Sequence, residues 1–159
     1  MRAAVLTVSD GVAAGEREDL SGDELESLLR AEGHEVVRRL VPDEHEAIAA
    51  ALRELSAAAS LILTTGGTGV APRDVTPEAT ASILERPAPG IAEAVRADAI
   101  RRTPHGLLSR GQAGTIGRTL IVNLPGSPGG CRDGFAVLQP ALGHALALLA
   151  DKATTHSQT

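Results

Sequence analysis

The strongest constraint on the fold of this chain is an alternation of short aliphatic runs with helical patterns. Each run is rich in Val, Ile and Leu, and a turn signal and apolar residues at helical spacing follow it. The predicted strands are Ala3–Val8, Glu35–Val41, Leu61–Thr65 and Thr119–Leu124. Strands that alternate with helices predict an α/β fold with an open, mostly parallel sheet and helices on both faces.

Local start and stop signals predict where the helices lie. Ser21 with Glu24 forms a capping box, and Gly33 ends the helix that begins there. Asp43 is expected to cap a second helix, and Thr76 a third. Two later helices are predicted from Pro89 to about Arg102 and, with a bend near Pro140, from Cys131 to Asp151. The segment between them, Arg102–Gly114, is expected to be a loop with one helical turn.

A chain of 159 residues is long enough for one domain with its own core, which we assign to residues 1–152. Residues 153–159 are expected to form a loose tail. The apolar run at the N-terminus is too short for a signal peptide, and no stretch has the length of a membrane span. These features predict a cytoplasmic protein.

Composition excludes several classes of function. A net charge of −5, with one Phe and no Trp or Tyr, argues against nucleic-acid and anionic-membrane partners. Lys152 is the only lysine, which excludes the lysine of a P-loop. Cys131 is the only cysteine, so neither an intramolecular disulfide nor a thiolate zinc cluster can form. The histidines show no metal-ligand spacing.

Candidate site residues follow the predicted strands, where open α/β sheets bind their ligands. The densest group is the glycine loop Thr64–Gly69, with three glycines in four residues. Such a loop either cradles a phosphate or makes a tight turn, and the loop alone favours neither. Its spacing matches neither a P-loop nor a Rossmann fingerprint.

Charged residues close behind the glycine loop favour the phosphate interpretation. Asp74 could hold Mg²⁺ and Arg73 could reach a phosphate, although a helix cap and a surface charge are the structural alternatives. Taken alone, Asp43 is better explained as a helix cap. Ser109 and Arg110 lie in an irregular segment and could contact an oxyanion or phosphate.

The string Leu63–Gly69 followed by Arg73–Thr80 resembles the MogA/MoaB family of molybdenum cofactor biosynthesis proteins. The chain is similar in the same way to the G domain of gephyrin and of the plant cofactor-biosynthesis protein. Shorter matches follow in family order at Val8–Gly11, Asp19–Gly22, Val41–Glu44, Pro89–Ile91, Leu108–Arg110 and Asn123–Pro128.

The resemblance implies a three-layer α/β domain that assembles as a homotrimer or homohexamer. It also implies Mg²⁺-dependent adenylylation of molybdopterin, in which the terminal phosphate of the pterin attacks the α-phosphate of ATP and pyrophosphate leaves. The implied partners are molybdopterin, ATP and a molybdate-insertion protein, without nucleic acid or membrane.

The resemblance also implies roles for individual residues. Asp43 and Asp74 would be the catalytic and metal-holding carboxylates. The nucleotide phosphates would lie against Ser9, Asp10, Thr65, Gly66, Gly67, Thr68, Gly69 and Arg73. The pterin would lie near Ser109, Arg110, Pro125, Gly126 and Ser127.

Two alternatives stay open at this point. Some MoaB-type relatives resemble molybdopterin carriers or assembly scaffolds that transfer little or no adenylyl group. The related domain of competence-damage-type proteins serves pyrophosphate hydrolysis on another nucleotide. The presence of both aspartates favours the adenylyltransferase.

Overall fold

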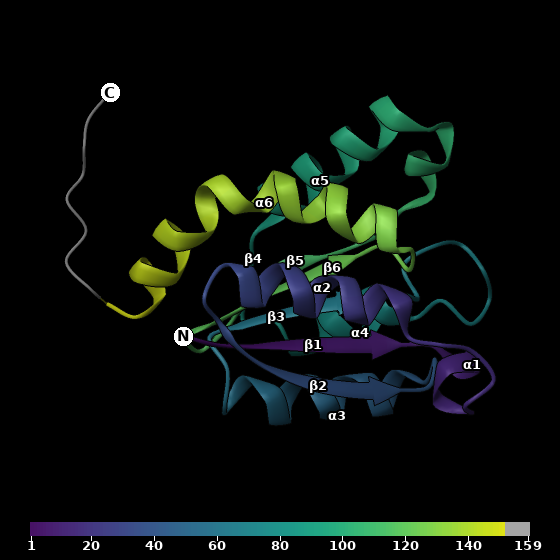
Figure 1. Cartoon of the computed structure of the whole chain (residues 1–159), viewed down its shortest axis with the longest axis horizontal. Coiled ribbons are helices and arrows are strands. Elements are labelled where there is room, and N and C mark those ends of the chain that lie inside the picture. The colour runs from purple at the N-terminus through teal and green to yellow at the C-terminus, as the bar shows by residue number, and fades with distance from the viewer. Residues whose placement is uncertain (152–159) are drawn as a thin grey trace.

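The computed structural model describes residues 1–151, and within them one mixed sheet lies between layers of helices (Figure 1). The order of strands in the sheet is β2-β1-β3-β6-β5-β4. Their bounds are β1 Arg2–Val8, β2 Glu35–Val41, β3 Leu61–Thr65, β4 Arg86–Pro87, β5 Ala113–Ile116 and β6 Thr119–Leu124. Strands β2, β1, β3 and β6 pair in parallel, whereas β5 and β4 are antiparallel to their neighbours. The predicted open, mostly parallel sheet is confirmed.

The helices cover both faces of this sheet. Their bounds are α1 Asp10–Ala13, α2 Leu20–Ala31, α3 His45–Ser56, α4 Thr76–Ile83, α5 Pro89–Arg102, the 3-10 helix η1 Pro104–Leu108 and α6 Pro128–Leu149. Helices α2, α5 and α6 lie on one side and α3 and α4 on the other, which gives the three layers expected from the family resemblance (Figure 1).

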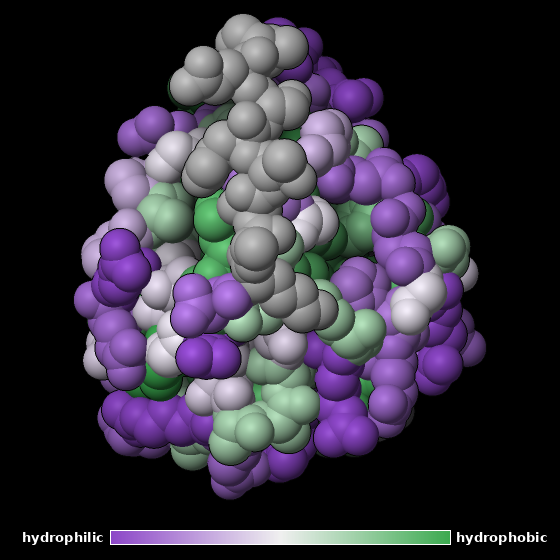
Figure 2. Space-filling model, turned by 90° about the vertical axis from the view of Figure 1, so that its left-hand side faces the viewer, coloured by the Kyte–Doolittle hydropathy of each residue, from purple (hydrophilic) through white to green (hydrophobic). Residues whose placement is uncertain are grey.

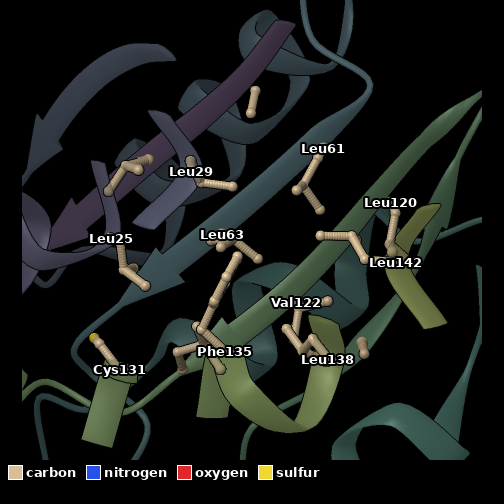
Figure 3. Packing of buried hydrophobic residues seen from close by; sticks show 14 of the residues in the cluster. Leu25, Leu29, Leu61, Leu63, Leu120, Val122, Cys131, Phe135, Leu138 and Leu142 are labelled. Carbon is tan, nitrogen blue, oxygen red and sulfur yellow. The ribbon is translucent and has the colours of Figure 1, made fainter. Parts of the chain in front are cut away.

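Each face of the sheet has its own aliphatic core. Along β1, Ala3 and Val5 face α2 and α6, whereas Ala4 and Leu6 face α3 and α4, because successive side chains of a strand point to opposite faces. Phe135 of α6 joins the first core, beside the leucines of β3 and α2 (Figure 3). Both cores therefore consist almost entirely of leucine, valine, isoleucine and alanine, with Phe135 as the aromatic residue among them.

Parallel pairing sets the carboxyl ends of four strands side by side. Val8 pairs with Val41, and Thr65 pairs with both Thr7 and Leu124. The loops that leave these strands therefore start from one edge of the sheet, as the strand-end argument requires. Figure 2 views the opposite end, where the strands begin, and there polar side chains surround patches of apolar ones.

Two of the predicted helix caps are wrong. The N-cap of α2 is Asp19, whose Oδ1 accepts the main-chain N–H of Gly22 at 3.1 Å, while Ser21 is buried inside the first turn. The N-cap of α3 is Glu44, which makes no side-chain cap, and the Asp43 carboxylate bonds elsewhere. The first error displaces the cap by two residues, and the second arises because the partner of Asp43 lies 33 positions away in the sequence.

Three further boundaries differ from the prediction. Thr76 is the first residue of α4 rather than its cap, because its hydroxyl donates to the carbonyl of Gly66 at 2.9 Å. Helix α6 begins at Pro128, capped by the hydroxyl of Ser127, and ends at Leu149. The segment predicted as a loop contains the 3-10 turn, as expected, but also the start of β5.

Within residues 1–151, no helix combines the length and apolarity needed to cross a membrane. The tail predicted at residues 153–159 lies outside the described residues.

Candidate active site

Two clefts open at the edge where the parallel strands end. The first cleft has a volume of about 590 Å³ and the second about 510 Å³. The first is lined by Thr7, Val8, Ser9, Val12, Arg17, Glu18, Leu20, Ser21, Asp43, Thr65, Gly66, Gly67, Asp74, Gly126 and Pro128. The second cleft lies between the glycine loop, α5, η1 and the start of α6.

Asp10 and Asp43 join the loops after β1 and β2. The main-chain N–H of Asp10 donates to Oδ2 of Asp43, and that of Asp43 donates to Oδ1 of Asp10, both at 2.9 Å. Arg73 closes the pair from the loop after β3, with Nε 2.6 Å from Oδ2 of Asp10 and Nη2 3.1 Å from its Oδ1. Three strand ends are thereby bound together at the first cleft.

The two carboxyls of this pair are shifted in opposite directions. The hydrogen bond from Arg73 lowers the pKa of Asp10, and the main-chain N–H of Asp43 adds to the effect. Partial burial raises the pKa of Asp43, and the nearby carboxylates of Asp10 and Asp74 raise it further. Asp43 therefore bears its negative charge at an energetic cost in the ligand-free protein, which favours binding of a cation beside it.

The glycine loop approaches the first cleft without side chains. Gly66 and Gly67 have φ of 98° and 68°, a backbone region that favours glycine. A Cβ on Gly66 would collide with the carbonyl of Val8, and one on Gly67 would lie 3.1 Å from Oδ1 of Asp43. Main chain, rather than side chain, therefore forms the floor next to the aspartates.

Asp74 reaches the same cleft from the end of the loop that follows. Its Oδ2 accepts the main-chain N–H of Ala71 at 3.1 Å, which closes a short turn. The main-chain N–H of Asp74 donates back to the carbonyl of Ala71 at 2.9 Å. This local turn fixes one carboxylate oxygen of Asp74.

A single stretch of main chain, Pro125–Pro128, separates the two clefts. Gly126 and Pro128 line the first cleft, whereas Pro125 and Ser127 line the second. The hydroxyl of Thr65 holds the stretch by donating to the carbonyl of Pro125 at 2.7 Å. A Cβ on Gly126 would lie 3.2 Å from the Cα of Gly66, so the two main chains nearly touch.

The second cleft is bordered by a braced turn. Arg96 of α5 donates from Nε to the carbonyl of Ser109 at 2.8 Å and from Nη2 to that of Gly111 at 2.9 Å. Beneath, buried Asn123 accepts the main-chain N–H of Gln112 at 3.0 Å. The turn that presents Ser109 is thus fixed by side chains from a helix and a strand.

The structure divides the residues singled out in the sequence among three places. The first cleft takes Ser9, Asp43, Thr65, Gly66, Gly67, Asp74 and Gly126. The second takes Thr68, Gly69, Ser109, Pro125 and Ser127. The side chains of Asp10, Arg73 and Arg110 bond to neighbouring residues around the clefts. Gly126, which the resemblance puts near the pterin, thus shares a cleft with Asp43 and Asp74, and Thr68 and Gly69, which it puts near the nucleotide, share a cleft with Ser109.

Comparison with known proteins identifies the family of this chain. Residues 4–144 match the model of a family described as a probable molybdopterin binding domain. The chain is 48% identical to the molybdopterin biosynthesis enzyme MoaB from Thermus thermophilus, with a TM-score of 0.88 over 95% of this chain and 97% of that one. The chain belongs to the MogA/MoaB family. This confirms the family that the sequence motifs predicted.

Curated relatives of this MogA/MoaB family member differ in length. Molybdopterin adenylyltransferase of Helicobacter pylori (strain ATCC 700392 / 26695) is 35% identical over 150 residues, which are 91% of this chain and 85% of the relative. The molybdenum cofactor synthesis protein cinnamon of Drosophila melanogaster is 41% identical over 151 residues, which are 92% of this chain and 25% of the relative. The chain therefore spans only a quarter of that longer protein.

Sequence reasoning did not assign the outer wall of the first cleft. Arg17, Glu18, Leu20 and Ser21 line it, and Nη2 of Arg17 donates to the hydroxyl of Ser9 at 3.1 Å. The family motif at residues 19–22 was a signal for Leu20 and Ser21. Arg17 belongs to no motif, and only the fold brings it to Ser9.

The carboxylates of this family member suit a magnesium ion that is shared with a bound phosphate. Among residues 1–151, no group of three or more His, Cys, Asp or Glu side chains could hold a metal by itself. Mg²⁺ usually binds one or two carboxylates together with substrate phosphates. Asp43 and Asp74 line one cleft, where partial burial and the neighbouring carboxylates of Asp10 and Asp74 raise the pKa of Asp43. The donor set therefore fits Mg²⁺ that arrives with a nucleotide.

Proposed function

We propose that this protein is a molybdopterin adenylyltransferase of molybdenum cofactor biosynthesis. The observation that carries the proposal is the pair of clefts on opposite sides of Pro125–Pro128. The first presents Asp43 and Asp74 beside a glycine floor, whereas the aspartates that line the second, Asp98 and Asp133, pair with Arg102. Two substrates held on either side of one main-chain stretch can bring their reacting phosphates together at its end. The name of the Helicobacter pylori relative supports the same reaction.

The first cleft suits the ATP phosphates. Gly66 and Gly67 present only main chain, so phosphate oxygens can approach closely. Asp43 and Asp74 would hold Mg²⁺, which would neutralise charge on the nucleotide phosphates. Arg73 holds Asp10, which in turn bonds to Asp43, and it carries a positive charge next to this cleft. Molybdopterin would occupy the second cleft, with Ser109 and Ser127 beside it.

The chemistry needs positioning more than a strong base. A phosphate monoester already carries negative oxygens at neutral pH, so no histidine is required to activate it. One of these oxygens forms a bond to the α-phosphorus of ATP. The bond from that phosphorus to the bridging oxygen of the β-phosphate breaks, and its electron pair leaves with pyrophosphate. The residues of the two clefts orient the partners in line and exclude water.

Incubation with molybdopterin, ATP and Mg²⁺, followed by detection of adenylylated molybdopterin and pyrophosphate, tests the proposal. The Asp74→Asn variant should lose at least about a hundredfold in rate while still binding the pterin. Glu54→Gln, the same change of charge on an exposed residue of α3, is the matched control and should keep wild-type activity. A carrier would bind molybdopterin and yield no product, and a pyrophosphatase would cleave nucleotide without the pterin.

We further propose that the protein works as a homotrimer or homohexamer and passes its product to a molybdate-insertion protein, as the resemblance implies. Light scattering of the purified protein checks the assembly. A monomer at micromolar concentration would rule the assembly out without affecting the proposed reaction.

A further inference from the structure

Arg110 joins two segments that belong to different clefts. Its Nε donates to the carbonyl of Gly69 and its Nη2 to the carbonyl of Asp74, both at 2.7 Å. Its Nη1 bonds to the carboxylate of Glu78 on α4. The main-chain N–H of Arg110 donates to the carbonyl of Thr68 at 2.8 Å. Every nitrogen of the guanidinium is therefore bonded to the glycine loop or to the segment that follows it.

These bonds grip both ends of an exposed excursion. Residues 70–73 are exposed and form no helix or strand, and Val70 keeps 63% of its surface accessible. Gly69 precedes this excursion and Asp74 ends it. The other ties of Asp74 are to Ala71 inside the same excursion, so they cannot fix it relative to the sheet. The neighbours of Asp74 are tied to the strand ends, Arg73 to Asp10 and Thr76 to Gly66. Arg110 bonds Asp74 itself from outside the excursion, through a planar fork of directed donors.

Arg110 is itself held on both sides. Arg96 binds the carbonyls of Ser109 and Gly111, the residues immediately before and after it. A continuous brace therefore runs from α5 through Ser109–Gly111 to Asp74. It passes from a wall of the second cleft to the main-chain carbonyl of Asp74, a residue that lines the first.

We propose that Arg110 is a positioning residue that holds Asp74 at the first cleft, rather than a ligand of the pterin as the sequence suggested. The inference rests on the proposed function for the role of Asp74, but the brace itself consists of hydrogen bonds within this chain. Loss of one directed, charge-assisted bond corresponds to roughly a tenfold effect, which sets the expected scale.

The first measurement is hydrogen exchange in the ligand-free protein. In Arg110→Gln, the amides of residues 69–76 should exchange about tenfold faster, and those of β1, β3 and β6 should be unchanged. Arg110→Lys keeps the positive charge but not the planar fork, so its exchange rates at residues 69–76 should lie between those of wild type and Arg110→Gln. Glu78→Gln leaves the bonds from Arg110 to the carbonyls of Gly69 and Asp74 in place. It should therefore change these exchange rates less than either substitution of Arg110. Unchanged exchange in Arg110→Gln and Glu78→Gln alike overturns the proposal.

The second measurement is binding of Mg²⁺ with the α,β-methylene analogue of ATP, which cannot undergo the transfer. Arg110→Gln should weaken this binding about tenfold and leave molybdopterin binding unchanged. In turnover, KM for Mg²⁺-ATP should rise and KM for molybdopterin should not. A rise in KM for molybdopterin with unchanged KM for Mg²⁺-ATP would make Arg110 a pterin ligand and overturn the proposal. Faster amide exchange with unchanged nucleotide binding would overturn it as well.

The exposed ion pair between Arg39 and Glu54 provides the control, because its side chains are 47% and 61% exposed and lie on β2 and α3. Arg39→Gln should change neither exchange at residues 69–76 nor nucleotide binding. Failure of the proposed function can be told apart from failure of the Arg110 proposal. In the first case wild-type protein would form no adenylylated product, and the exchange measurement would still test the brace.

Discussion

Asp10 and Asp43 each accept a hydrogen bond from the main-chain N–H of the other, although 33 positions separate them in the sequence. The exchange closes the ends of β1 and β2 into one unit. It also explains why the two carboxyls differ, since Arg73 binds only Asp10. One carboxylate is thus neutralised and structural, and the other is left with its charge facing the cleft.

The opposite pKa shifts predict opposite effects of removing each charge. The pKa of Asp43 is raised by burial and by its acidic neighbours, so its ionisation disfavours the fold once the pH exceeds the unfolded pKa. Asp43→Asn should therefore raise Tm at pH 7, and the gain should vanish as the pH falls toward the unfolded pKa. The asparagine oxygen can still accept the N–H of Asp10.

Asp10→Asn is the counterpart with the opposite sign. Its pKa is lowered by Arg73, so its charge stabilises the fold above the unfolded pKa and the benefit is lost as the pH falls through the folded pKa. This variant should lower Tm at pH 7 and resemble wild type in acid. Calorimetric scans of both variants across pH 3–8 check the pair, and a shift of the same sign at pH 7 would contradict it.

Two glycine substitutions separate conformational strain from steric collision. Gly66 and Gly117 both have positive φ, but a Cβ on Gly66 meets the carbonyl of Val8, while one on Gly117 has no neighbour within 4 Å. Gly117→Ala should cost about 1 kcal/mol of unfolding free energy. Gly66→Ala should cost about 3 kcal/mol or more and abolish activity. Urea titrations measure both, and equal costs would contradict the collision.

Asn123 ties the sheet to α4 by a buried network. Its Nδ2 donates to the hydroxyls of Thr64 and Thr80, both at 3.0 Å. Asn123→Ala should lower the free energy of unfolding by about 2 kcal/mol, and Thr80→Val by about 1 kcal/mol. The double variant should cost less than the sum by about 1 kcal/mol, because the two residues share a bond. Strict additivity in a double-mutant cycle would count against the network.

The thiol of Cys131 should be unreactive in the native protein. It is buried beneath the wall between the clefts, its Sγ lies 3.2 Å from the carbonyl of Pro125, and burial raises its pKa to about 11. At pH 8 only about one thiol in a thousand would be ionised. Iodoacetamide should modify the native chain far more slowly than the urea-unfolded chain, and comparable rates would contradict this.

The strands that could be predicted are those whose identity is local. Glu35–Val41, Leu61–Thr65 and Thr119–Leu124 were recovered because aliphatic runs end at turn residues. Strand β4 was missed because two residues, Arg86 and Pro87, carry no periodicity, and β5 because its pairing depends on β6. Such short strands carry no signal in their own residues, because they form only by pairing with an adjacent strand.

The candidate site likewise contains residues that local sequence predicts and residues whose place depends on distant partners. The glycine loop could be picked out from the sequence, because positive φ values such as those of Gly66 and Gly67 favour glycine. The caps assigned to Asp43 and Thr76 failed because their side chains bond across loops, to Asp10 and Gly66. Arg17 and Arg96 could not be found at all, because a long side chain can reach several places and the fold selects one.

The partition at Pro125–Pro128 is only one main chain thick, and its residues face the two clefts by turns. A surface loop usually has one side exposed to solvent, where substitutions are tolerated. This stretch has none, because each of its residues lines one cleft or the other. Saturation mutagenesis should therefore find it less permissive than the glycine loop's exposed continuation at residues 70–73, although it contains no charged side chain.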